Sequence, residues 1–232
     1  MAYNFKQNFD NLRGRVRPSK SNSRTDKRVI SKFTQKMGFV YFGSVNQHYD
    51  DHRIVRGFSV SSTHNDNHYS VGSIDGYDVT LVDRSDTTKD IDGKKISYNL
   101  MIVEIDLHTV KDIPHIFISA KNHDPKPYIN LFRTFPALKE VEMGTFEPYG
   151  PEFTSRYELY AKPTQAIEVE RLFPATSARV IGAHFWPFSA EIHERTVYMY
   201  ADNERVTLNM LNALIENGVW LAKHLDLQAE LV

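Results

Sequence analysis

The sequence predicts a single α+β domain built on a mainly antiparallel sheet. Three observations lead to this fold class. Segments of period-two alternation follow one another through most of the chain, helical apolar stripes stand apart from them, and the longest stripe comes last. The chain has 232 residues, 41% hydrophobic and 25% charged, an ordinary composition for a domain that buries its own core.

Strand-like alternation begins near position 39 and continues to position 200. The expected strands are 39–45, 54–61, 69–74, 77–83, 98–107, 115–120, 155–161, 188–193 and 196–200. The clearest local signal is Asp75-Gly76, a pair suited to the two-residue type I′ turn of a hairpin. Polar turns separate the other strands, so we expect a mainly antiparallel arrangement.

Four helices are expected around these strands. A basic helix over residues 26–37 is capped by Asp26, and two short helices open at Pro127 and Pro163 and stop at the next proline. A long C-terminal helix over about residues 204–226 carries an apolar stripe that would pack across the sheet.

Charge divides the chain into two parts. Residues 1–37 hold ten Lys/Arg and two acidic residues, whereas residues 38–232 hold eighteen basic and twenty-seven acidic residues. Residues 1–25 are also rich in Gly, Pro, Ser and charge. We therefore expect a flexible basic arm over 1–25 and one α+β domain over 26–232.

The arm is the feature that indicates a partner. Each phosphate neutralised by Lys or Arg releases condensed counterions, so a nucleic acid or an anionic membrane surface is a suitable partner. The residues expected to contact it are Arg13, Arg15, Arg17, Lys20 and Arg24. Two alternatives remain, namely docking of the arm on an acidic body of the same protein and a role as a targeting segment.

Histidine spacing offers one metal hypothesis. His48 and His52, like His64 and His68, are four residues apart, a spacing that binds metal from one face of a helix. Both pairs lie between expected strands, at opposite ends of a meander, so solvated turns are the favoured interpretation. The acidic run over 83–92 is likewise interpreted as a solvated hairpin loop, because it lacks the order of a calcium loop.

Residues 182–188 are dense in aromatic side chains. Phe185 and Trp186 are candidates for the lip of a ligand site. Aromatic residues beside a proline more often anchor a core, and that interpretation is favoured.

Several chemical classes are excluded or left without support. There is no cysteine, hence no disulfide, thiolate metal site or cysteine nucleophile. The apolar runs are too short to span a bilayer and no apolar stretch follows Met1, so we expect a cytoplasmic protein, at most peripheral to a membrane. No phosphate-loop, dinucleotide, nucleophile-elbow or zinc-protease pattern occurs, so no cofactor and no catalytic residue is predicted.

Three stretches taken together, residues 71–81, 156–174 and 188–200, precede the long final helix. In that order they resemble a family of uncharacterised bacterial proteins known by a domain-of-unknown-function label. The resemblance covers about residues 38–228 and implies a bacterial origin, but no activity and no catalytic residues. Many members carry transmembrane helices ahead of the soluble domain, where this chain has its basic arm.

The sequence thus predicts a non-catalytic binding or interaction module whose arm contacts an anionic surface or a protein partner. Two alternatives stay open. One is a metal-assisted hydrolase that uses His and Asp side chains between residues 48 and 68. The other is a structural subunit of a homo-oligomer.

Overall fold

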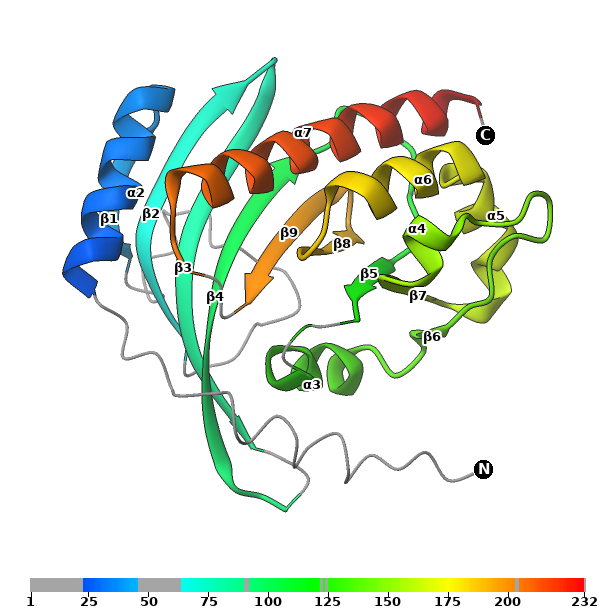
Figure 1. Ribbon diagram of the computed structural model, residues 1–232, viewed down its shortest axis with the longest axis horizontal. Coiled ribbons are helices and arrows are strands. Elements are labelled where there is room, and N and C mark those ends of the chain that lie inside the picture. The colour runs from blue at the N-terminus through cyan, green and yellow to red at the C-terminus, as the bar shows by residue number, and fades with distance from the viewer. Residues whose placement is uncertain are drawn as a thin grey trace.

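The computed structural model describes residues 23–45, 64–89, 92–121, 123, 125–202 and 205–231. Within these residues the fold is α+β, as predicted, with one antiparallel nine-stranded sheet and helices on both of its faces (Figure 1). The strands are β1 Val40–Val45, β2 Asn65–Ile74, β3 Tyr77–Lys89, β4 Lys95–Asp106, β5 Ile116–Ala120, β6 Lys139–Glu140, β7 Tyr157–Ala161, β8 Ser189–His193 and β9 Thr196–Asp202.

The helices include the four that the sequence predicts and two more. They are α2 Ser23–Met37, α3 Pro125–Thr134, α4 Pro151–Thr154, α5 Ala166–Leu172 with the preceding 3₁₀ turn η1 Pro163–Gln165, α6 Ala175–His184 and α7 Leu208–Leu231. None of the helices in the described ranges is both long enough and apolar enough to cross a membrane.

The strand order is β1-β2-β3-β4-β9-β8-β5-β7-β6. The first four strands form a meander, and the β8–β9 hairpin then inserts between this meander and β5. Pairing of β4 with β9 runs from Leu100↔Asp202 to Asp106↔Thr196, and so joins the two halves of the chain. This central pairing makes one continuous sheet out of segments about a hundred residues apart.

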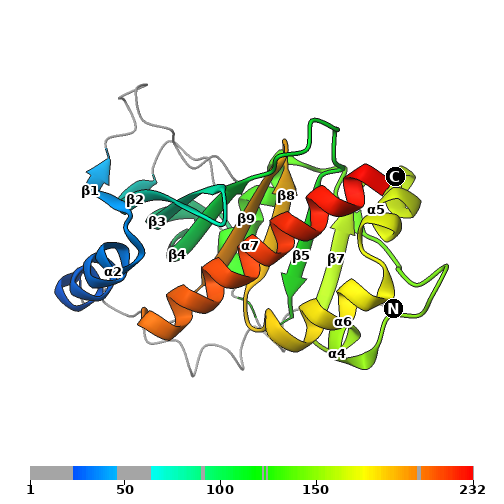
Figure 2. The same ribbon diagram turned by 90° about the horizontal axis from the view of Figure 1, so that it is seen from above.

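Helix α7 crosses one face of the sheet, with α2 beside the meander and α4 and α6 beside the second half (Figure 2). Helix α3 lies on the opposite face, over a second, smaller apolar cluster. At Gly218 a Cβ atom would lie 2.7 Å from Ile105 Cδ1 and 3.0 Å from Met199 Cγ. The absence of a side chain at this position therefore lets α7 pack closely on β4 and β9.

The β2–β3 turn confirms the hairpin prediction. Asp75 and Gly76 have φ angles of 52° and 87°, as a type I′ turn requires. The last helix was expected from about residue 204, but α7 starts at Leu208, where the Thr207 hydroxyl accepts a 3.1 Å hydrogen bond from the Met210 amide. The basic helix starts at Ser23, three residues earlier than predicted.

Two segments differ from the sequence interpretation. The acidic run was expected to be a loop, yet β3 continues through Asp83 and Asp86 to Lys89, paired with β4 throughout. Helix α6 was not predicted. Pro174 was interpreted as the end of a helix, but it also occupies the N-cap position of α6, where its fixed φ is tolerated. The expected strand 54–61 lies outside the described residues.

Candidate functional site

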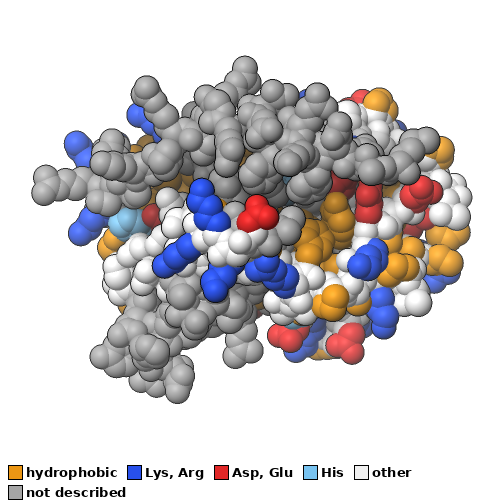
Figure 3. All heavy atoms as spheres, turned by 90° about the horizontal axis from the view of Figure 1, so that it is seen from below, with side chains coloured by type: hydrophobic (Ala, Val, Ile, Leu, Met, Phe, Trp, Pro, Cys, Tyr) orange, Lys and Arg blue, Asp and Glu red, His pale blue; other side chains and the backbone are white. Residues whose placement is uncertain are grey.

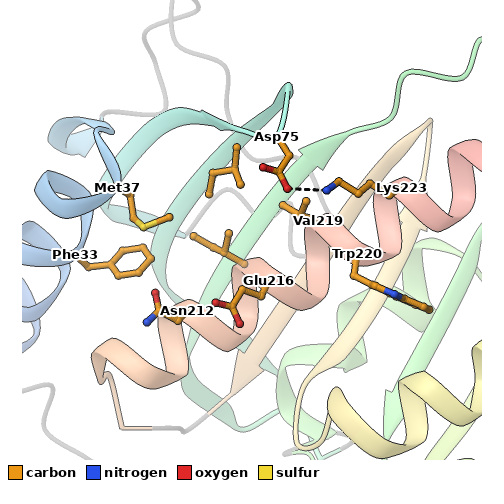
Figure 4. A pocket seen from close by; sticks show the side chains of 10 residues that line it. Phe33, Met37, Asp75, Asn212, Glu216, Val219, Trp220 and Lys223 are labelled. Atoms are coloured by element: carbon orange, nitrogen blue, oxygen red, sulfur yellow. Dashed lines mark hydrogen bonds and ion pairs between the residues drawn. The ribbon is translucent and has the colours of Figure 1, made fainter.

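A pocket of about 320 Å³ opens between α2, α7 and the β2–β3 turn (Figure 4). We call it the α2–α7 pocket. Its apolar lining consists of Phe33, Met37, Ile74, Ile215, Val219 and Trp220. Phe33 and Met37 are one turn apart on α2, and Ile215 and Val219 are one turn apart on α7, so each helix presents two of them on one side.

The rim of the pocket is polar and carries both signs of charge. It consists of Asp75, Asn212, Glu216 and Lys223. The Lys223 ammonium lies 2.6 Å from a carboxylate oxygen of Asp75, and these side chains are 49% and 60% exposed. An ion pair this exposed contributes at most about 1 kcal/mol. It therefore orients the β2–β3 turn toward α7 without closing the pocket firmly.

Trp220 is held at the pocket by rings on both sides. Its indole stacks on the His224 imidazole, with centroids 5.2 Å apart and planes 3° apart. The ring of Phe185 meets it edge-on at 5.6 Å. His224 in turn contacts the Leu172 carbonyl oxygen through Nε2, at 2.9 Å. The indole is thus positioned by Phe185, which directly follows α6, and through His224 by the end of α5.

The pocket has the composition of a ligand-binding site. An apolar lining with a few polar groups at the rim is the usual pattern of a ligand pocket, and 320 Å³ lies at the small end of such sites. The side chains of its lining that could exchange a proton are those of Asp75, Glu216 and Lys223. Nowhere in the described ranges do three or more His, Cys, Asp or Glu side chains converge to hold a metal.

A buried polar network lies on β2 and β3, away from the pocket. The Arg84 guanidinium is fully buried and donates two 2.7 Å hydrogen bonds to the carboxylate of Asp66. Tyr98 donates a 3.0 Å hydrogen bond to Asp86. Burial raises the pKa of Asp83 to about 6, and the charges of Asp26 and Asp66 add to this effect. These contacts explain how a run that looks like a solvated loop is accommodated inside the sheet.

Most of the predicted partner-binding residues lie outside the described residues. This applies to Arg13, Arg15, Arg17 and Lys20, so their contact with an anionic partner stays a prediction. Arg24 is part of α2.

The structure does not bring the described histidines of the metal hypothesis together. His48 and His52 lie outside the described residues. His64 is buried 3.7 Å from Asp66, whereas His68 Nδ1 lies 2.7 Å from the Tyr41 hydroxyl on the side of the sheet that faces α2. A β-bulge between Asn67 and Ser70 interrupts the alternation of side chains along β2, so His64 and His68 point to opposite faces of the sheet.

Of the two lip candidates, Phe185 is a core residue. Only 1% of its surface is exposed, so it contacts Trp220 from the core side and is not accessible to a ligand. Trp186 is half-buried and meets the ring of Tyr157 edge-on at 6.1 Å. The sequence interpretation missed the pocket because most of its apolar residues belong to helix stripes expected to pack fully into the core.

Comparison with known proteins gives one informative likeness. No protein-family model matches the chain, and no curated protein matches it. The crystal structure of the mycobacterial trehalose monomycolate transport factor A, TtfA, is similar to it with a TM-score of 0.53. The match covers 88% of this chain and 94% of that chain at 10% sequence identity. At this identity the likeness shows a shared fold and no more.

Proposed function

We propose that this chain is a non-catalytic binding module that holds the apolar tail of an amphiphilic ligand in the α2–α7 pocket. The observation that carries the proposal is the pocket itself, with an apolar lining from three elements and a polar rim of mixed charge. A small apolar space suits an alkyl chain, and the polar rim suits a polar head group. The similar solved structure, described as a transport factor and not as an enzyme, is compatible with a binding role.

The two tryptophans of the chain make the proposal directly testable. In a Trp186→Phe variant, Trp220 is the one remaining tryptophan of the chain, and it lines the pocket. Titration with decyl maltoside below its micelle concentration is expected to shift the Trp220 emission to shorter wavelength and to saturate at one equivalent. The shift arises because the alkyl chain displaces water from the indole.

Asn212→Phe is expected to fill the mouth of the pocket and to weaken this binding at least about tenfold, by steric exclusion of the tail. Gln35→Phe is the matched control, because Gln35 is an exposed amide on α2 that does not line the pocket. A response that does not saturate, or one that Asn212→Phe leaves unchanged, would contradict the proposal.

The basic arm over residues 1–25 remains part of the proposed function, as the contact to an anionic surface or a protein partner. The end of the β3–β4 hairpin, residues 89–95, carries three lysines against two aspartates, and Lys89, Lys94 and Lys95 are all exposed there. Lys and Arg side chains lie together on the side of the molecule seen in Figure 3. Lys89 and Lys95 are directly opposite each other, an arrangement of like charges that a bound anion would relieve.

Deleting residues 1–24 is expected to abolish sedimentation of the protein with anionic vesicles at low salt, because six basic side chains are removed. Neutral vesicles serve as the control. Sedimentation that is unchanged by the deletion would show that the arm is not the contact. The homo-oligomer alternative also stays a prediction, which mass measurement in solution at low and high salt would test.

A further inference from the structure

Two imidazoles lie side by side on the sheet face that α3 covers, remote from the α2–α7 pocket. Strands β5 and β8 are antiparallel, and Ile116 pairs with Ile192. One position further along the pair, His115 therefore lies opposite His193. Their ring centroids are 4.3 Å apart, with planes inclined by 47°. Both side chains are only partly buried, so small solutes can reach them.

A buried carboxylate fixes the orientation of one of these rings. His115 Nε2 lies 2.6 Å from Glu191 Oε1, and Glu191 is fully buried. The other carboxylate oxygen, Oε2, accepts a 2.6 Å hydrogen bond from the Tyr200 hydroxyl. Phe135 packs edge-on against His115 at 4.4 Å and limits its rotation.

This arrangement determines which nitrogen of His115 can act as a ligand. A carboxylate so close to Nε2 favours the tautomer in which Nε2–H donates to Glu191. The lone pair is then on Nδ1. The same order, carboxylate, imidazole and metal, recurs in protein metal sites, where the carboxylate orients the ring and raises its basicity.

We propose that His115, through Nδ1, and His193 bind one divalent transition-metal ion, such as Zn²⁺ or Cu²⁺. Imidazole is a favoured ligand for these ions. No third His, Cys, Asp or Glu joins a cluster among the described residues, so water or a further ligand completes the coordination. Glu191 is a positioning residue behind His115. The site is independent of the proposed amphiphile binding.

Titration of the full chain with Cu²⁺, followed by electron paramagnetic resonance, tests the site. We expect one Cu²⁺ equivalent whose spectrum shows coupling to two imidazole nitrogens, and we expect Zn²⁺ to displace it. His193→Phe keeps an aromatic ring beside Phe135 and is expected to remove this equivalent. His184→Phe is the matched control, because His184 is exposed on α6, and it is expected to leave the spectrum unchanged.

Glu191→Gln separates a positioning role from ligation. The variant is expected to weaken Cu²⁺ binding by about 10–100-fold while the two-nitrogen spectrum is retained at saturation. An unchanged number of Cu²⁺ equivalents in both His193→Phe and His115→Phe would overturn the proposal. So would equal losses in His193→Phe and His184→Phe, which would indicate adventitious binding to any histidine.

Discussion

Replacing Arg84 with methionine is expected to lower the free energy of unfolding by about 3–5 kcal/mol. Arg84 is fully buried, and its two 2.7 Å hydrogen bonds neutralise the carboxylate of Asp66, which is 5% exposed. Methionine fills most of the same volume, so little of the loss comes from a cavity. The loss arises because a buried carboxylate is left without the cation that neutralised it. Urea unfolding followed by circular dichroism measures the change.

Lys223→Met is the matched control for this prediction. It removes an ion pair of similar length, 2.6 Å to Asp75, but one whose partners are about half exposed. Its cost is expected to stay below about 1 kcal/mol. If Arg84→Met costs no more than Lys223→Met, the network around Arg84 does not stabilise the fold as we infer. The double variant Arg84→Met/Asp66→Leu should recover part of the loss, because the carboxylate that lost its cation is then removed as well.

Leu221→Ala is expected to lower the free energy of unfolding by about 2–5 kcal/mol. Leu221 is fully buried near the middle of α7, in the core that this helix forms with the sheet. Truncation removes apolar contacts and leaves a cavity that the close approach of α7 at Gly218 prevents from collapsing. Thermal and urea unfolding of the purified variant measure the loss.

Leu227→Ala tests whether this cost comes from burial and not from a change in helix propensity. Leu227 is on the same helix but 57% exposed, so the same substitution is expected to change stability by at most about 0.5 kcal/mol. Equal effects of the two variants would mean that α7 is not docked on the sheet as described.

Much of the local structure could be predicted from neighbouring residues alone. The turn at Asp75-Gly76 needs two positive φ angles, and this residue pair tolerates them at low cost. The helices that begin near Pro127 and Pro163 depend on the fixed φ of proline. The long final helix followed from its apolar stripe. Each of these signals acts within a few residues along the chain.

The acidic strand shows where such signals fail. Asp83 and Asp86 look solvated in sequence, because charged side chains are rarely buried without partners. The partners of Asp86 and of the neighbouring Arg84 come from other strands of the sheet. Tyr98 is on β4, and the Asp66–Arg84 pair joins β2 to β3. These polar side chains can be buried only because strand pairing brings them within reach of hydrogen-bond partners.

By itself, the sequence determined the α+β class, the β2–β3 turn and the positions of the main helices, since period, turn chemistry and proline placement are local properties. The tertiary structure alone decided the rest. Pairing of β4 with β9 depends on contacts about a hundred residues apart. The α2–α7 pocket and the His115–His193 pair exist only because separate elements meet, and no local pattern encodes such a meeting.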